Sequence, residues 1–401
     1  MYLFYFFALV GIWLGIKSLR GGLRYRAYVR REAARALVDF TPFVSVIAPS
    51  RGLDEGLSEN IAALFRQNYP SYEILFVCDR PDDPSVKVIE KLKAANDSRV
   101  PARLIIAGAA TDSGQKVHNL RVATREVSAQ CEVMVFVDTD ARPDSNWLRH
   151  LVQPLTDESL GAATGYRWFV PEKGGLASRL RSVWNSSIAS ALGANRDKNF
   201  CWGGSTAIRR ETFERLKAAE RWRGSVSDDF TLTGILQEAK LPIHFTPQCL
   251  VASVGDCGFH ELLEFTTRQL KITRVYAPHL WKAVLLGGLF FNLVFFGGLL
   301  LVFVRAALGL SFLLPFMLLS IIFTLGAAKA FVRWQAVTIP LFRFRKKLRR
   351  DLPTHLLLWP FASSLYVYNA IAAAFSRRIQ WRGITYELKS PTEAVIISRD
   401  S

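Results

Sequence analysis

The sequence predicts an α/β fold with a mostly parallel sheet, joined to membrane-spanning helices near both ends of the 401-residue chain. Two observations carry this prediction. Apolar, β-branched runs alternate with stretches of helical periodicity between residues 43 and 138, which is typical of a sheet covered by helices. Long apolar runs with few charges lie near the two ends, and half of all residues are hydrophobic.

The alternating segments are short and well bounded. Their strands read as continuous apolar runs, as expected for a sheet buried on both faces. The second helix has an Asp-Pro-Ser cap that begins at Asp83. In order, we expect a strand at 43–48, a helix at 59–70, a strand at 72–79, a helix at 83–95, a strand at 102–108, a helix at 116–129 and a strand at 131–138.

Three apolar segments, at 1–16, 283–304 and 306–328, are long enough or nearly long enough to cross a bilayer. We take 1–16 as an uncleaved anchor and not a signal peptide, because its charges follow the apolar run and no small-residue cleavage site is evident. A fourth segment, 355–375, contains a proline, and the sequence leaves open whether it spans the membrane or is re-entrant.

Clusters of Lys and Arg orient these segments. A basic juxtamembrane linker at 17–40 follows the first, and a basic loop at 329–354 precedes the last. Basic flanks favour the cytoplasmic side, which places a domain at 41–280 in the cytoplasm, with 376–401 as a C-terminal tail. The membrane is either a bacterial plasma membrane or an organellar one.

The formal net charge of +17 favours an anionic partner. Because the positive charge is concentrated beside the membrane segments, lipid head groups and phosphorylated substrates fit better than nucleic acid. The oligomeric state cannot be read from the sequence.

Polar residues follow the predicted strands, at the edge of the sheet where ligands bind. Residues 49–52 follow the first strand, Asp79 ends the second, and Asp138 and Asp140 end the fourth. Two carboxylates spaced in this way suit a hard cation such as Mg²⁺ or Mn²⁺, although a solvated turn is the simpler alternative. Asp79 suits a hydrogen bond to a base or ribose.

Two later segments complete the set of candidates. Asp229 follows Asp228 at the start of a helical run, where the pair suits either helix capping or a general base. Gly203 and Gly204 lie in a polar segment before a strand, where they form either a simple turn or a close approach of backbone to ligand. The sequence lacks the G-x-G-x-x-G and P-loop patterns, which argues against an ordinary nicotinamide enzyme or P-loop ATPase.

Taken in order, VSVIAPSRG, CDRPDDP, GQKVHNL, FVDTDARP, CWGGSTAIRR, VSDDF and RQLKI resemble the motifs of membrane-anchored family 2-type glycosyltransferases. The likeness is strongest to the ceramide glucosyltransferase-like branch. It covers about residues 40–280, and it extends to the flanking membrane segments and to QWRG near the C-terminus. The resemblance implies a Rossmann-like GT-A fold and a nucleotide-sugar donor.

The resemblance also implies roles for single residues. Asp79 matches the aspartate that contacts the nucleoside, Asp138 the one near the donor sugar and phosphates, and Asp140 completes a metal-binding D-x-D. Asp229 matches the catalytic base. The remaining donor-site positions, to which we add the two glycines, are Pro49, Arg51, Gly52, Lys116, Gly203 and Gly204.

The last family motif, Q/R-x-x-R-W, is altered in this chain. Its first position is Arg268, Lys271 replaces the second arginine, and Ile272 replaces the tryptophan. Lys271 keeps the positive charge but cannot make the bidentate contacts of arginine. The missing tryptophan counts against a processive polysaccharide synthase, in which that ring helps to hold the acceptor sugar.

We therefore expect a metal-dependent, inverting hexosyltransferase that moves a hexose, with glucose as first choice, from a UDP-sugar to the hydroxyl of ceramide or diacylglycerol. Asp229 would take the acceptor proton, while Arg268 and Lys271 would add positive charge around the diphosphate. A polyprenyl-phosphate sugar transferase and a polysaccharide synthase are alternatives. A catalytically silent membrane scaffold is the alternative from another class.

Overall fold

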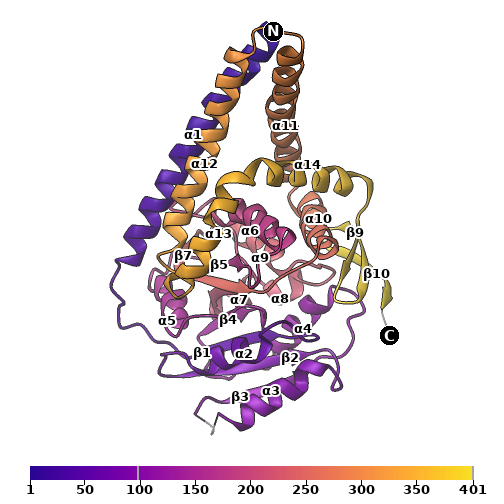
Figure 1. Cartoon of the computed structure of the whole chain (residues 1–401). Coiled ribbons are helices and arrows are strands. Elements are labelled where there is room, and N and C mark those ends of the chain that lie inside the picture. The colour runs from indigo at the N-terminus through magenta and orange to yellow at the C-terminus, as the bar shows by residue number, and fades with distance from the viewer. Residues whose placement is uncertain (97–98, 400–401) are drawn as a thin grey trace. The chain divides into compact units, whose positions relative to one another are not determined.

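The structure is a computed structural model that describes residues 1–96 and 99–399, and the chain forms two compact units. Unit 1 comprises Met1–Arg31, Pro171–Ser190 and Asp256–Ser376, and unit 2 comprises Glu32–Val170, Ala191–Gly255 and the chain from Arg377 on (Figure 1). The predicted segment 41–280 is thus divided, because 171–190 and 256–280 group with the membrane helices.

Unit 2 contains a seven-stranded sheet with the order β3-β2-β1-β4-β6-β5-β7. The first four strands are parallel, β6 runs antiparallel to both of its neighbours, and β5 and β7 are parallel. The strands are β1 (Val44–Pro49), β2 (Tyr72–Cys78), β3 (Ala102–Ile106), β4 (Val133–Val137), β5 (Ala162–Val170), β6 (Ser205–Arg209) and β7 (Ile243–Val254). The expected mostly parallel α/β sheet is confirmed.

Burial explains why the strand sequences are so apolar. Every residue of β2 and β4 is buried, so neither face of these strands meets water. Asp83 caps α3, as expected, because its carboxylate accepts a hydrogen bond from the Ser85 amide at 2.8 Å and Pro84 follows it. The helices of unit 2 are α2 (Leu57–Phe65), α3 (Pro84–Ala94), α4 (Gln115–Ala123), α5 (Trp147–Val152), α7 (Arg210–Arg215), α8 (Ala218–Arg221) and α9 (Asp228–Glu238).

The C-terminal tail forms a second, three-stranded sheet in unit 2, with the order β10-β9-β8. It consists of β8 (Arg378–Trp381), β9 (Ile384–Ser390) and β10 (Glu393–Arg399). A two-residue turn joins β8 to β9, and both of its residues, Arg382 and Gly383, have positive φ, at 52° and 72°. Such a turn matches the twist of a hairpin, which explains the glycine of QWRG.

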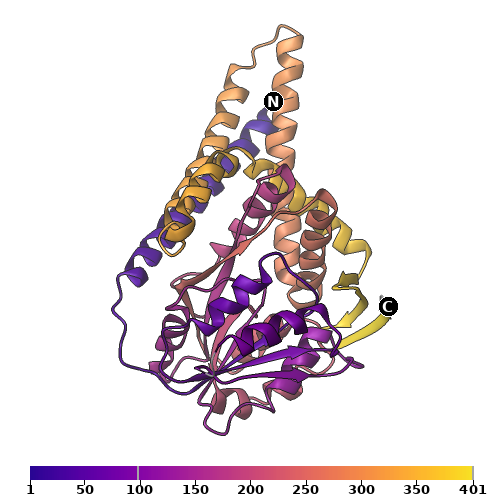
Figure 2. The ribbon, with the colours of Figure 1, turned by 60° about the horizontal axis from the view of Figure 1, so that its bottom comes forward.

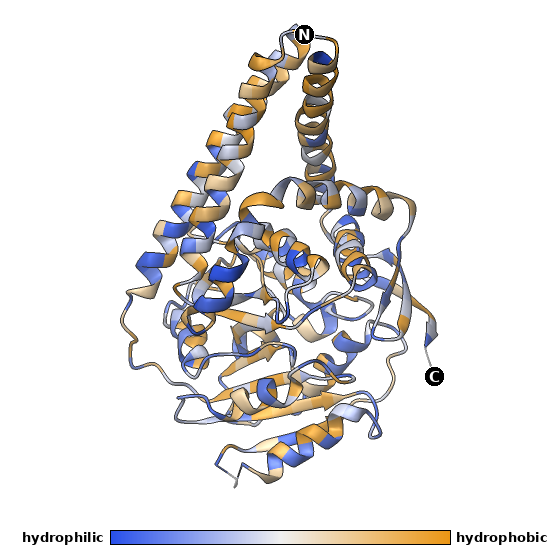
Figure 3. Cartoon of the chain, in the orientation of Figure 1, coloured by the Kyte–Doolittle hydropathy of each residue, from blue (hydrophilic) through white to orange (hydrophobic). Residues whose placement is uncertain are grey.

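Unit 1 holds three helices that are long and apolar enough to cross a membrane: α1 (Tyr2–Ala33), α11 (Pro278–Ala307) and α12 (Leu313–Val337). In Figure 3 long stretches of these helices are orange, the colour of hydrophobic residues. The chain is an integral membrane protein. Helix α1 is continuous through its basic half, so residues 17–33, expected to be part of a linker, are helical: the segment contains no proline, and Gly21 and Gly22 do not interrupt the helix.

The fourth membrane segment is bent. Helices α13 (Arg345–Leu357) and α14 (Trp359–Phe375) meet at an angle of 71°, a geometry that fits either a broken span or a re-entrant loop. The kink lies just before Pro360. Both expectations for 355–375 therefore stay open. Helices α6 (Leu176–Ala189) and α10 (Phe259–Tyr276) complete the longer elements of unit 1.

Small residues let α1 and α12 pack closely, side by side in both views (Figures 1 and 2). A Cβ atom on Gly15 would lie 3.0 Å from the side chain of Leu325, and one on Gly22 would lie 3.3 Å from that of Lys329. Glycine at such contacts allows two membrane helices to approach each other where apolar lipid gives them little reason to associate.

Candidate functional site

A cluster of charged side chains lies at the carboxyl end of β4 in unit 2. Asp138 forms one ion pair with Lys116 Nζ at 2.7 Å and another with Arg167 Nη2 at 3.1 Å. The second nitrogen of the same guanidinium, Nη1, reaches Asp140 at 2.9 Å. Arg167 thus bridges the two carboxylates, so that the D-x-D segment forms a turn in which both acids face one group.

Lys116 joins this cluster to the start of α9. Its ammonium lies 3.2 Å from Asp228, and its pKa is also raised by the nearby Asp229 carboxylate. Burial disfavours the charge on Lys116, but Asp138 and Asp228 outweigh burial and raise its pKa. The predicted basic position of the donor site therefore links the second and third predicted acidic motifs.

The pKa values of the half-buried Asp138 and the buried Asp228 shift in opposite directions. Burial disfavours the ionised form of Asp138, but Lys116 and Arg167 outweigh it and lower its pKa. Burial raises the pKa of Asp228 to about 6, because Lys116 offsets it only in part and the neighbouring carboxylates add to it. The Lys116–Asp228 contact stabilises both charges, yet the cost of burial dominates for Asp228, which is 4% exposed.

Gly203 and Gly204 lie against the same cluster. A Cβ on Gly203 would lie 2.0 Å from Asp228 Oδ2 and 2.9 Å from Lys116 Nζ. A Cβ on Gly204 would lie 2.8 Å from Asp138 Oδ2 and would overlap the ring of Trp202. Glycine at both positions leaves room for the charged side chains, which is a physical reason for the two-glycine segment.

Asp229 lies in the first turn of α9, partly exposed. Its Oδ1 accepts hydrogen bonds from Ser227 Oγ and from the Phe230 amide, the latter at 2.8 Å. Ser227 is also the N-cap of the helix. In the described part of the chain, both hydrogen bonds of Asp229 end on Oδ1, which leaves Oδ2 for an incoming hydroxyl.

The opening loop and Asp79 form a second group, at the ends of β1 and β2. Arg51 donates to Asp79 Oδ2, and the amide of Gly52, whose φ is +73°, donates to Asp83 at 3.0 Å. Pro49 is the last residue of β1. Asp79 Oδ1 is buried without a hydrogen-bond partner in the described chain, so a polar ligand group can satisfy it.

The C-terminal sheet brings one further residue to this edge that the sequence reasoning did not assign. Arg382 makes a bidentate contact with Asp54, both oxygens at 2.7 Å, and its carbonyl accepts from Arg51 Nε at 2.9 Å. Burial disfavours the charge of Arg382, but the carboxylates of Asp54, Asp140 and Asp138 outweigh it and raise its pKa. Arg382 belongs to the QWRG motif, which is part of the family resemblance, but no role was assigned to its arginine from the sequence.

Two hydrogen bonds anchor the tail sheet on the start of α4. Tyr386 Oη accepts from the Gln115 amide at 3.1 Å, and Arg399 Nη1 donates to Gln115 Oε1 at 3.0 Å. These contacts hold β9, which follows Arg382, and β10 beside Gln115, the residue that precedes Lys116.

Sequence reasoning also missed Arg167, the bridge between the two D-x-D carboxylates. It lies inside β5, in the run AATGYRWFV, and its guanidinium stacks 4.8 Å from the centre of the Trp202 ring. The available signal was a single charge inside an otherwise apolar buried strand, since such a charge needs a partner.

The donor set of Asp138 and Asp140 fits a divalent cation. Asp140 Oδ1 is buried and has no hydrogen-bond partner among the described residues, so one carboxylate oxygen is available. The described chain offers no group of three or more His, Cys, Asp or Glu residues as a metal site. Such a pair suits Mg²⁺ or Mn²⁺, which bind to one or two carboxylates and complete their coordination with substrate phosphates and water.

Arg268 and Lys271 lie on α10, which belongs to unit 1. Arg268 forms an ion pair with Glu264 at 3.3 Å, and burial lowers the pKa of Lys271. Their predicted contact with the diphosphate stays a prediction.

Unit 2 combines a mostly parallel sheet with a paired-carboxylate turn at a strand end, in a chain that also carries membrane-spanning helices. A family model describes the chain further. Residues 3–394 match the model of glycosyl transferase family 21, and the chain belongs to this family. The GT-A fold class expected from the sequence agrees with this membership.

The curated relatives include ceramide glucosyltransferases. The chain is 21% identical to ceramide glucosyltransferase 3 of Caenorhabditis elegans over 353 residues, which cover 86% of this chain and 73% of the relative. It is 31% identical to the ceramide glucosyltransferase of Candida albicans over 124 residues, but these cover only 28% of this chain and 22% of that protein.

Two solved structures are also similar. The mannosyltransferase PcManGT of Pyrobaculum calidifontis, in complex with GDP-Man and Mn²⁺, aligns with a TM-score of 0.48 and 18% identity, covering 92% of this chain and 98% of that one. Glucosyl-3-phosphoglycerate synthase of Mycobacterium tuberculosis, in complex with Mn²⁺ and UDP-glucose, aligns with a TM-score of 0.37 and 15% identity, covering 62% and 82%.

Proposed function

We propose that the protein is an inverting, metal-dependent glycosyltransferase that moves a hexose, in the first place glucose, from a UDP-sugar to the hydroxyl of a membrane lipid, ceramide or diacylglycerol. The observation that carries the proposal is the ionic link from Asp138 through Lys116 to Asp228, which joins the turn for the donor phosphates to the helix that presents Asp229. Membership of glycosyl transferase family 21 and the names of the curated relatives support it.

Each charged residue has a task in this proposal. Asp138 and Asp140 would hold the cation, which when bound would supply positive charge beside the donor diphosphate and favour departure of the nucleotide. Asp79 and Arg51, at the ends of β2 and β1, orient the nucleoside. Asp229 accepts the proton of the acceptor hydroxyl through Oδ2 while Ser227 holds its other oxygen.

We place the catalytic unit on the cytoplasmic side of the membrane. The basic residues of α1 gather in its second half, and those of the 329–354 loop lie between α12 and the bent helix pair. Both clusters follow the positive-inside rule if unit 2 is cytoplasmic. A lipid acceptor suits this arrangement, since its hydroxyl stays at the membrane surface near an enzyme that is anchored there.

The direct test is a donor and acceptor screen with the full-length protein in lipid nanodiscs. A panel of UDP- and GDP-sugars is offered with ceramide, diacylglycerol or a polyprenyl phosphate in the presence of Mn²⁺ or Mg²⁺, and the products are identified by mass spectrometry. A glucosylated ceramide or diacylglycerol is the expected product. A glycosylated polyprenyl phosphate or a sugar polymer would replace the proposal with one of its enzymatic alternatives.

Variants test the assigned base. Asp229→Asn is expected to lower the transfer rate by about 10²–10⁴-fold, because the hydroxyl then has no base to accept its proton. Asp82→Asn is the matched control, since Asp82 is exposed in the loop before α3 and pairs only loosely with Arg80 at 3.5 Å. Normal transfer by a folded Asp229→Asn protein would refute the assignment. Absence of hydrolysis and transfer with every donor would instead favour the scaffold.

A further inference from the structure

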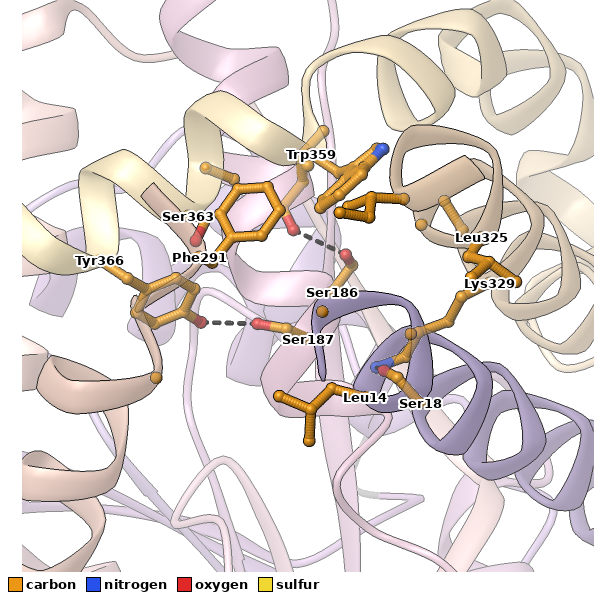
Figure 4. A pocket seen from close by; sticks show the side chains of 18 of the residues that line it. Leu14, Ser18, Ser186, Ser187, Phe291, Leu325, Lys329, Trp359, Ser363 and Tyr366 are labelled. Atoms are coloured by element: carbon orange, nitrogen blue, oxygen red, sulfur yellow. Dashed lines mark hydrogen bonds between the residues drawn. The ribbon is translucent and has the colours of Figure 1, made fainter. Parts of the chain in front are cut away.

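Unit 1 contains a cavity of about 400 Å³ among its membrane helices, lined by residues of α1, α6, α11, α12, α13 and α14 (Figure 4). Much of the wall is apolar, with Leu14, Phe291, Leu325 and Trp359 among the lining residues. A volume of this size is in the range of pockets that bind small molecules. The apolar wall and the membrane setting favour a lipid as the occupant.

Two cations of α12 line the same cavity. Lys329 and Arg333 are four residues apart and therefore lie on one face of the helix. Lys329 Nζ donates to Ser18 Oγ at 2.7 Å, and Arg333 Nη1 donates to Ser186 Oγ. Both cations are thus held by neutral hydroxyl groups.

These two charges lack a carboxylate. Among the described residues, none of those that line the cavity is Asp or Glu, and no ion pair joins Lys329 or Arg333 to one. Arg333 is only 8% exposed, and its Nε is buried without a hydrogen-bond partner in the described chain. A buried cation beside a half-buried one, without a counter-ion, is costly, and an anion in the cavity would neutralise them.

The chemistry of the two side chains suits phosphate. Arginine offers several N–H donors in one plane and lysine a compact charge, and both bind phosphate oxygens well. The hydroxyl groups of Ser187 and Tyr366, joined at 2.7 Å, line the cavity as well and can bond ester or glycerol oxygens (Figure 4).

The position of the cations along α12 suits a lipid head group. Both lie in the C-terminal half of the helix. Two residues beyond Arg333, Gln335 accepts a hydrogen bond at 2.5 Å from Arg26, which lies in the basic half of α1. Apolar residues of the same helices, such as Leu14 and Ile322, line the rest of the cavity. A charged end near the membrane boundary with an apolar continuation matches an amphiphile whose phosphate lies at the surface.

We propose that this cavity binds the phosphate head group of an anionic membrane lipid, with Arg333 and Lys329 as its ligands. The proposed acceptors, ceramide and diacylglycerol, are neutral, so this is a lipid site beyond the proposed reaction. It does not depend on which sugar is transferred.

Lipid binding to the full-length protein tests the proposal. The protein is purified in a neutral detergent and incubated with phosphatidylglycerol, a polyprenyl phosphate, phosphatidylcholine or inorganic phosphate, and the bound species are counted by native mass spectrometry. We expect at least one of the two anionic lipids to bind about tenfold or more tightly than phosphatidylcholine, because the choline cation of phosphatidylcholine cancels the charge of its phosphate and is repelled by Lys329 and Arg333. Equal binding of phosphatidylcholine would overturn the proposal, as would a preference for inorganic phosphate over both lipids.

Three variants make the test specific. Lys329→Gln and Arg333→Gln are each expected to weaken binding of the anionic lipid about tenfold, while Lys282→Gln, which removes an exposed cation on α11, is expected to leave it unchanged. If Arg333→Gln fails to fold, Lys329→Gln decides the matter, because Lys329 is less buried. Unchanged affinity in a folded Lys329→Gln protein would refute the site. Transfer assays on the same samples report on the proposed function separately.

Discussion

Gly203→Ala offers the sharpest test of the charged cluster at the end of β4. The new methyl carbon would lie 2.0 Å from Asp228 Oδ2, whereas ordinary contacts of a Cβ begin at 3.4 Å. The carboxylate or the backbone must therefore move by more than about 1 Å. Lys116 Nζ, 2.9 Å from the same methyl, blocks the movement on one side.

The expected magnitude follows from this displacement. Forcing one extra methyl into a packed site costs about 1–3 kcal/mol of folding free energy. The Lys116–Asp228 ion pair, now 3.2 Å, is the contact that lengthens, and Lys116 also holds Asp138. A shift of about 1 Å in catalytic groups can cost on the order of 100-fold in rate. We expect Gly203→Ala to lose both stability and transfer activity.

Gly193→Ala is the matched control. It lies in the same unit, and a Cβ there would meet no atom within 4 Å. Thermal unfolding and the rate of sugar transfer, or of donor hydrolysis in the absence of acceptor, are measured for both variants. If Gly203→Ala equals Gly193→Ala in both measurements, the close packing of Gly203 on Asp228 does not exist in the protein, and the described cluster is wrong.

Three further predictions concern unit 2. Arg167→Met should lower the unfolding free energy by about 3 kcal/mol or more, because it leaves Asp138 and Asp140 without their bridge. In thermal unfolding, Mn²⁺ should raise the melting temperature of this variant more than that of the wild type. An equal increase in the two proteins would contradict the metal site. Folding raises the pKa of Asp228 from 3.8 to about 6, so the folded wild type binds a proton that the unfolded chain releases, and its stability falls as the pH rises between these values. Asp228→Asn lacks this titration, so its stability relative to the wild type should increase as the pH rises over the same range in denaturation experiments. A constant difference would refute the shift. Asp83→Ala should cost about 1–2 kcal/mol in urea unfolding through loss of the α3 cap, whereas Asp83→Asn should retain most of it; equal losses would contradict the cap.

The local sequence was sufficient for the strands and for the acids at their ends. Strand β4 is apolar at every position and ends just before Asp138, so both the strand and its polar end are visible in the order of residues. The parallel direction of β3, β2, β1 and β4 follows from the alternation with helices, whereas their order in the sheet does not. Lys116 was predicted by resemblance, and the structure gives it two carboxylate partners.

The partners of those acids were less visible. Arg167 lies in β5 and Arg382 in a hairpin more than 200 residues further along the chain, and neither is near the acids in sequence. A contact between distant segments depends on which strands become neighbours, and hydrophobic periodicity carries no information about that pairing. The basic residues 17–33 were likewise read as a linker by composition, although they continue α1 without a break.

The sequence by itself determined the class of the fold, the apolar helices near both ends of the chain, and the acidic residues at the sheet edge, because periodicity, length and strand ends are local properties. Only the tertiary structure decided how those acids are neutralised and where unpaired charge is left. It placed Arg167 between Asp138 and Asp140. It also placed Lys329 and Arg333 in a cavity among the membrane helices that has no Asp or Glu among its described lining residues. The physical reason is that the energy of a charge depends on its neighbours in space and on its burial, and folding sets both.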